Sequence, residues 1–429
     1  METTLELLQQ AGYGALQLLA GPFYYIAVLI IVLHYFRQTR TERKLFHVRL
    51  HAWPVLLFRT VVAGLAAGAV ISVTMAFIGV TITAGTIYWV WGTAAVLLLF
   101  RVRYLCFAYS VGLLGILQWG AGWWDWSGGA QWIATASASL AALEIPGLLL
   151  LVALLHAAEA LFIRSQNTRL ATPMFMEGKR GKLVGGYQLQ GYWPVPLLLL
   201  VPAQTGSAAE TALPWTPLLG GDLWSAGWMI AGLPMVVGFS EVTRSMVPQQ
   251  RARRTSGSLL YYSLLLTAVA AAAAWWAPLT PVAALCALAV HEAIIWIHAR
   301  KESEHPPLFV HDEQGLKVLA IVPGTPADEL RIVAGEVIHK VNGIRVRTKD
   351  ELHEALQENS AFCKLEVFNL EGQLKFVQRA RFAGEHHQLG VILAPDDSAQ
   401  YFAAAKPATL LDLFRRKGGV KSRDRSASL

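Results

Sequence analysis

Long apolar runs separated by short polar segments dominate residues 1–299 of the chain. A helix that crosses a bilayer needs about 20 mostly apolar residues, because lipid offers the backbone no hydrogen-bond partner. The runs 192–203 and 226–240 are short for a crossing, and they predict a tilted pair of crossings or a re-entrant hairpin. Together with seven longer apolar runs, they predict that residues 1–299 form an α-helical polytopic membrane bundle of about eight or nine helices. The longer runs are 15–36, 55–78, 82–100, 104–122, 146–163, 259–276 and 281–297.

From residue 306 the pattern changes to short runs in which apolar and polar residues alternate, which is typical of β-strands. The segment Asn342-Gly343 is a hairpin-turn signal. Thr348 can cap a helix over 349–358 that carries Leu352 and Leu356 on one face. We therefore expect a small α+β domain over residues 306–395, followed by a flexible basic tail over residues 396–429.

Charge is divided between the same two parts. Residues 1–299 contain 17 Lys and Arg with 11 Asp and Glu, whereas residues 300–429 contain 19 and 18. Only 15% of the whole chain is charged, against about a quarter in soluble domains, so the first part is expected to lie in lipid. Basic loops next to a membrane explain the formal net charge of +7, and no nucleic-acid partner is expected.

The basic residues of the first part predict its orientation. Alternating crossings place the basic segments 37–59, 101–103, 164–182 and 244–254 on one side, and the opposite loops carry acids but no Lys or Arg. Basic loops face the cytoplasm in membrane proteins. We therefore expect a multi-pass protein of the cell membrane with its N-terminus outside, and with the C-terminal domain and tail in the cytoplasm. The basic tail is also expected to contact anionic membrane lipid.

Two pairs of ionisable residues interrupt the apolar runs, and such residues are costly in lipid unless they are paired. His156 and Glu159 are three positions apart, so they share a helix face and can pair with each other. This pair keeps open the alternative of a proton-coupled membrane transporter. The other pair is His291 and Glu292, in a later run.

The segment His-Glu-Ala-Ile-Ile-Trp-Ile-His, which begins at His291, must be compared with the His-Glu-x-x-His zinc motif of intramembrane site-2-type metalloproteases. Ile295 stands where that motif has its second histidine. His298 lies about 10 Å further along the helix, too far to share one zinc ion. The motif is incomplete, so we expect an inactive relative at most, with no catalytic residues, no metal and no cofactor.

The three cysteines, Cys106, Cys286 and Cys363, are scattered along the chain without CxxC spacing. They predict neither a disulfide framework nor a metal-binding motif. We interpret them as small apolar residues.

The run 322–343, VPGTPADELRIVAGEVIHKVNG, resembles the signature of bacterial PDZ domains. The resemblance implies that an extended peptide, or the C-terminus of a ligand, is bound as an added strand. The carboxylate-binding loop of that family has its best match at 388–392, late in the domain, which implies a circularly permuted PDZ-like fold. Gly390 would let the backbone approach the carboxylate, although a plain final strand stays an alternative. The peptide-binding residues that the resemblance implies are Leu389, Gly390, Val391 and Ile392, with Leu352 and Leu356 opposite them.

The order of a multispan bundle and a permuted PDZ domain resembles the MinJ family of cell division topological determinants. The segments LFVHDEQGLKVLAIVPGTPADE and GEHHQLGVIL are similar to that family. The resemblance implies a membrane scaffold without enzyme activity that uses its PDZ domain to recruit partners. The implied partners are DivIVA-like and MinD-like division proteins, the implied role is to position the Min machinery, and the implied location is the division septum and poles.

Overall fold

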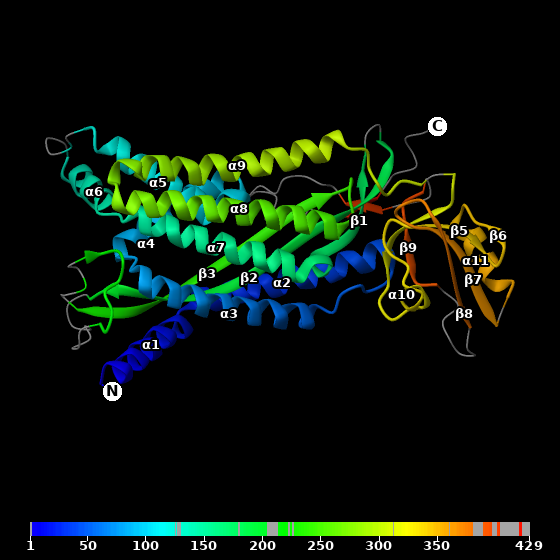
Figure 1. Ribbon diagram of the computed structural model, residues 1–429, viewed down its shortest axis with the longest axis horizontal. Helices are drawn as coiled ribbons and strands as arrows, with labels where there is room; N and C mark the ends of the chain where they lie inside the picture. The colour runs from blue at the N-terminus through cyan, green and yellow to red at the C-terminus, as the bar shows by residue number, and fades with distance from the viewer. Residues whose placement is uncertain are drawn as a thin grey trace.

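The computed structural model describes residues 2–124, 126, 130–178, 181–203, 213–221, 224, 227–311, 313–359, 361–380, 389–396, 401–403 and 420–422. The molecule is elongated, with helices and two long strands along its length and a small sheet domain at one end (Figure 1). The predicted fold class is confirmed, because a helical region with several apolar helices precedes a sheet-rich C-terminal domain.

The apolar runs with the strongest signal form helices. Proline occupies the first turn of α2, α3 and α8, where its missing amide hydrogen leaves no bond unmade. The helices are α1 Glu2–Ala20, α2 Pro22–Phe46, α3 Trp53–Ile78, α4 Ala84–Phe100, α5 Phe107–Ala121, α6 Gln131–Ala141, α7 Ile145–Gln166, α8 Pro248–Trp275 and α9 Thr280–Glu304.

Among the described residues, four helices are long and apolar enough to cross a membrane, or up to five if the bent pair α1 and α2 counts as one. The two helices of that pair meet at an angle of 57°, within the predicted run 15–36. Helices α4 and α5 are apolar but have only 17 and 15 residues. Helix α7 is the central one, because 78% of its most apolar window is buried, against 22–33% for the other three.

The runs 192–203 and 226–240, expected as crossings or a re-entrant hairpin, lie in two long antiparallel strands. Strand β2 covers Leu183–Pro202 and pairs with β3, Trp228–Thr243, from Tyr187↔Thr243 to Pro202↔Trp228. The five-stranded sheet has the order β11-β10-β1-β2-β3. Its remaining strands are β1 Ala171–Glu177, β10 Tyr401–Ala403 and β11 Val420–Ser422.

Strand β2 runs along α3, on a line of small residues. A Cβ atom at Gly64 or Gly68 would overlap the carbonyl oxygens of Pro194 and Pro196, so only glycine allows this approach. One turn further, Ser72 Oγ accepts a 2.8 Å hydrogen bond from the amide of Leu198. Every second amide of a strand points to the same side. The nitrogens of the two prolines, which carry no hydrogen, therefore face α3, where no hydrogen bond to a neighbouring strand is needed.

The C-terminal domain contains a six-stranded sheet with the path β8-β7-β5-β4-β9, and β6 pairs with β5. The last strand of the domain therefore lies beside the first, in antiparallel pairing. This is the order that a circularly permuted PDZ fold requires. Its elements are β4 Leu316–Ile321, α10 Pro326–Glu329, β5 Val337–Val341, β6 Ile344–Arg345, α11 Lys349–Gln357, β7 Phe362–Phe368, β8 Leu374–Ala380 and β9 Val391–Leu393.

The C-terminal domain packs directly on the end of the long sheet. The amide of Gly185 on β2 donates to the carbonyl of Phe309 over 2.8 Å, and the hydroxyl of Tyr187 donates to the carbonyl of Leu319 on β4. Ile392 and Ala394 belong to the same apolar cluster as the helical body. The two parts, which the sequence analysis treats as separate domains over residues 1–299 and 306–395, therefore share one core.

Most of the tail expected over residues 396–429 lies outside the described residues. Two short described segments of it are strands. Strand β10 pairs in parallel with β1 at Met176↔Ala403, and β11 pairs with β10. These segments extend the sheet of the helical body.

Candidate peptide-binding site

Helix α11 is the helix that the sequence predicted opposite the peptide. It begins with a capping box, in which Thr348 Oγ1 accepts from the amide of Glu351 over 3.2 Å. The Glu351 carboxylate accepts from the amides of Arg347 (2.6 Å) and Thr348 (3.4 Å). These backbone bonds, above all the one from Arg347, lower the pKa of Glu351 from its ordinary value. The cap fixes the helix start, and with it the buried face that carries Leu352 and Leu356.

Gly390, directly before β9, is held by the domain's own backbone. Its φ is +80°, and a Cβ atom there would overlap the side chain of Thr325, in the turn after β4. Its carbonyl accepts from the amide of Val322 over 2.9 Å, and the carbonyl of Leu389 accepts from the amide of Ala327 over 2.9 Å. The sequence suggested that this glycine admits a ligand carboxylate. The structure adds an internal reason, since the left-handed φ and the contact with Thr325 both require glycine.

The predicted peptide-binding residues do not all share one face. Leu389 is buried in one apolar cluster with Leu352 and Leu356, and Val391 packs against that cluster. Ile392 points the other way, into the core shared with the helical body. Successive residues of a strand face opposite sides of the sheet, so Val391 and Ile392 cannot both face α11. The structure therefore places Ile392 away from the other five.

Strand β9 lies at one edge of its sheet, with β4 as its only neighbour among the described strands. An edge strand presents backbone groups to which an extended peptide can add. Since Val391 and Leu393 are only partly buried, a strand added here would also meet apolar side chains. The opposite edge of the sheet is β8, which carries the exposed side chain of Phe376.

The polar residues inside the helical body make contacts that the sequence only partly predicted. His156 and Glu159 pair as expected, with 2.8 Å between Nδ1 and Oε2. Glu292 accepts from Arg103 over 2.5 Å and from Tyr109 over 2.6 Å. These bonds connect α9 to α5 and to the short 3-10 helix Val102–Leu105 before it, and no local spacing predicts them.

The two histidines of the incomplete zinc motif belong to different clusters. His298 lies 3.1 Å from Glu241 on β3 and 3.1 Å from Ser258 on α8. His291 instead faces His156, with 5.0 Å between the ring centroids, and lies close to Cys106. The prediction that Cys106 is a small apolar residue did not include this cluster, because its three members are far apart along the chain.

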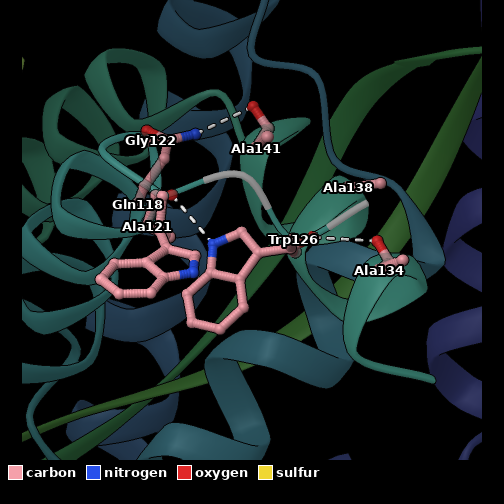
Figure 2. Close-up of a pocket in the computed structure, with 9 residues that line it drawn as sticks. Gln118, Ala121, Gly122, Trp126, Ala134, Ala138 and Ala141 are labelled. Carbon is pink, nitrogen blue, oxygen red and sulfur yellow. Dashed lines mark hydrogen bonds between the residues drawn. The ribbon is translucent and has the colours of Figure 1, made fainter. Parts of the chain in front are cut away.

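A surface pocket lies between α5 and α6, at the end of the helical body away from the C-terminal domain (Figure 2). Its side-chain donors already bond to backbone carbonyls. Gln118 Nε2 donates to the carbonyls of Leu140, Ala141 and Leu143 within 3.1 Å, and Trp126 Nε1 donates to the carbonyl of Ala121. The pocket therefore offers few unused polar groups to a ligand.

The apolar helices, followed by a sheet domain in which β9 is an edge strand, define the class of protein. It is a membrane protein with a helical body and a C-terminal PDZ domain. The family model described as "PDZ domain" matches residues 317–368. The chain belongs to the MinJ family. It is 32% identical over 396 residues to the cell division topological determinant MinJ of Bacillus subtilis (strain 168), a match that covers 92% of this chain and 96% of that protein. It is 25% identical over 387 residues to the probable cell division topological determinant MinJ of Lacticaseibacillus paracasei, covering 88% of this chain and 97% of that protein. No solved structure gives a significant match to the chain.

Proposed function

We propose that this protein is a non-enzymatic membrane scaffold that recruits cell division proteins through its PDZ domain. The observation that carries the proposal is the extent of the family match, which covers 92% of the chain and so includes both the helical body and the PDZ domain. A division-related adaptor needs an anchor in the membrane and a surface for partners. The apolar helices supply the first, and the β9 edge supplies the second.

The orientation proposed here has the N-terminus outside and the PDZ domain and tail in the cytoplasm. The basic last turns of α2, with Arg43 and Lys44, and of α7, with Arg164, support it. Both helix ends point towards the PDZ domain (Figure 1). Basic residues flank the cytoplasmic ends of membrane helices, so the PDZ domain would lie on that side.

The proposed partners are DivIVA-like and MinD-like proteins at the septum and poles, which would keep the Min machinery there. A partner would add an extended segment, or its C-terminus, as a strand beside β9. The direct contact of β4 and β9 with the helical body supports a fixed position of this edge relative to the membrane. A fixed edge suits a scaffold, because less orientational freedom is lost when a partner binds.

The polar groups inside the helical body need no catalytic role in this proposal. Glu292, which would be the general base of a zinc protease, is engaged by Arg103 and Tyr109. Ile295 supplies no metal ligand at the position of the second histidine.

The proposal is tested by placing a charge at each edge of the PDZ sheet. Val391→Glu puts a carboxylate at β9, and Phe376→Glu puts one at β8, the opposite edge. We expect Val391→Glu to lose septal localisation and co-purification of division proteins, as deletion of residues 306–395 would. Phe376→Glu should keep both. Equal membrane levels of the two variants serve as the folding control, and full partner recruitment by Val391→Glu would refute the β9 edge as the docking site.

A further inference from the structure

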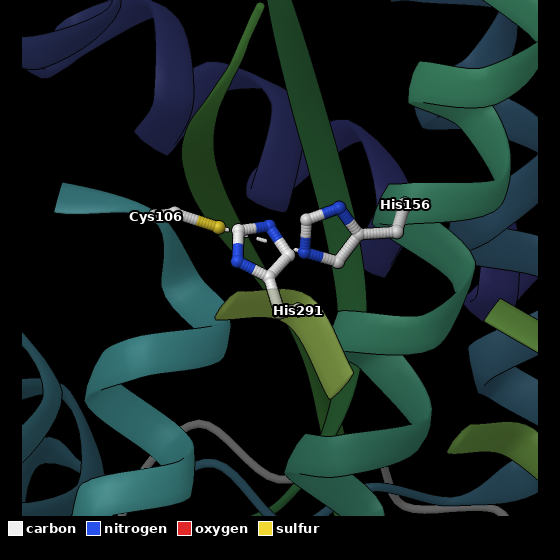
Figure 3. Close-up of side chains that lie close together, drawn as sticks. All are labelled: Cys106, His156 and His291. Atoms are coloured by element: carbon white, nitrogen blue, oxygen red, sulfur yellow. Dashed lines mark hydrogen bonds between the residues drawn. The ribbon is translucent and has the colours of Figure 1, made fainter. Parts of the chain in front are cut away.

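Cys106, His156 and His291 meet inside the helical body (Figure 3). Cys106 directly precedes α5, His156 lies on α7 and His291 lies on α9. One potential ligand atom from each side chain lies within 4.8 Å of the other two. We propose that these three side chains bind a transition-metal ion, with Zn²⁺ as the best fit.

The distance between the sulfur of Cys106 and one ring nitrogen of His156 suits such an ion. Sγ of Cys106 lies 3.5 Å from Nε2 of His156. Tetrahedral Zn²⁺ binds thiolate sulfur at about 2.3 Å and imidazole nitrogen at about 2.0 Å, which separates the two atoms by about 3.5 Å. The sulfur and nitrogen therefore already have the spacing of two zinc ligands.

The Glu159 carboxylate prepares His156 for metal binding. It accepts from Nδ1 of His156 over 2.8 Å, so the lone pair is left on Nε2, the nitrogen nearest to Cys106. Zinc-binding histidines commonly donate their second ring nitrogen to a carboxylate in this way. Both residues lie on α7, so this bond needs no other helix to form.

His291 provides an independent indication. The residue is 9% exposed, and its Nδ1 atom is buried without a hydrogen-bond partner among the described residues. Buried nitrogen atoms nearly always have a partner, because an unmet one costs free energy. A metal ion in the cluster would account for an imidazole held in this position.

The donor set favours Zn²⁺ over Mg²⁺ or Ca²⁺. One sulfur and two imidazoles form a borderline-soft set, whereas Mg²⁺ and Ca²⁺ prefer oxygen ligands. Binding would convert the Cys106 thiol to a thiolate and release one proton to solvent, with no change of oxidation state. The thiolate and the Glu159 carboxylate would then balance the charge of the ion. Three protein ligands leave a fourth position for water.

The site would fasten three helices of the body to one another. The nearby Glu292 is held by Arg103 and Tyr109, so it is not available as a ligand in this arrangement. Rings of Tyr109 and Tyr262 pack against His291, with centroids 5.1 and 5.5 Å away, and help to hold its imidazole in place. The proposed ion thus has a structural role, which is independent of the PDZ edge.

The test uses the full chain in detergent or nanodiscs, purified through a tag without histidines and stripped with a chelator. We expect Zn²⁺ to bind with one ion per chain. Co²⁺ in its place should give the strong visible bands of tetrahedral coordination and a thiolate-to-cobalt charge-transfer band. Since this signature is measured on the wild-type protein, it does not depend on the folding of any variant.

Variants then assign the ligands. Cys106→Ser should abolish the charge-transfer band, while the matched control Cys286→Ser, also within the helical body, should keep it. Glu159→Gln should weaken Zn²⁺ affinity by about 10- to 100-fold while leaving the band in place at saturation. The proposal is overturned if saturating Co²⁺ gives no charge-transfer band in the wild-type protein, or if Cys106→Ser retains it.

Discussion

Gly68 of α3 lies directly against the main-chain carbonyl of Pro196 on β2, so that a Cβ atom at residue 68 would overlap the carbonyl oxygen. Gly64 and Pro194 repeat the relationship one turn earlier. A long strand can therefore lie along a membrane-type helix at backbone contact distance. Tight packing of this kind depends on the absence of side-chain atoms.

Gly68→Ala is expected to destabilise the helical body by about 1–3 kcal/mol, because the added methyl group forces α3 away from β2. The matched control is Gly92→Ala in α4, where a Cβ atom meets nothing within 4 Å. That change should be neutral, or stabilising by up to about 1 kcal/mol, since alanine is the better helix former. Thermal unfolding of the detergent-solubilised protein, followed by tryptophan fluorescence, measures both. Equal transition temperatures for the two variants would contradict the packing described here.

Gly390→Ala is expected to loosen the PDZ domain for two reasons. Alanine disfavours a φ of +80° by about 1–2 kcal/mol, and its Cβ would displace Thr325 at a further cost of about 1–3 kcal/mol. Gly372→Ala separates the two effects, because its φ is +78° but its Cβ would meet nothing within 4 Å. Hydrogen exchange of the β4 amides should accelerate more in Gly390→Ala than in Gly372→Ala. Equal acceleration in the two variants would show that Thr325 yields freely.

Glu241→Gln is expected to destabilise the protein by about 1–3 kcal/mol, because it leaves the buried Arg251 with Glu302, 3.6 Å away, as its remaining carboxylate partner among the described residues. Glu241 accepts from Arg251 Nε (2.9 Å) and from its terminal nitrogen (2.6 Å), and the Arg251 side chain is only 4% exposed. The exposed pair Arg300–Glu304 provides the control, since Glu304→Gln should change stability by less than about 1 kcal/mol. Thermal unfolding curves of the two variants measure this difference in stability. Similar transition temperatures would argue against a buried network at this position.

Helix α11 is expected to lose its cap in acid. Backbone amides hold the pKa of Glu351 below its ordinary value, so its contribution is fully present above the unfolded-state pKa of about 4.3. That contribution is lost as the pH falls through the lower folded-state pKa. After correction for intrinsic exchange rates, the amides of 349–357 should become less protected as the pH falls below about 4. Glu351→Gln should flatten this pH dependence, whereas Glu354→Gln, on the exposed face of the same helix, should leave it unchanged. Identical profiles for the two variants would count against the capping role.

Some features were predictable because their causes are local. Seven apolar runs form helices, and the turn at Asn342 and Gly343 and the cap at Thr348 could be predicted from adjacent residues. The pairing of His156 with Glu159 follows from helical periodicity alone.

The long hairpin was not predictable in the same way. An apolar run such as Leu197–Val201 is compatible with a strand or a helix, and only the flanking Pro194 and Pro196 argue against a helix. The strand conformation is favoured because β2 packs on α3 at Gly64, Gly68 and Ser72. These residues lie more than a hundred positions earlier in the chain.

The sequence by itself determined the apolar helices and the PDZ turns, because spacing, chain length and capping act over a few neighbouring residues. Only the tertiary structure decided which face of β9 meets α11, which put Ile392 in the shared core. It alone also brought Cys106, His156 and His291 together. The physical reason is that these contacts join elements distant in the chain, where the packing of whole helices and strands sets the geometry.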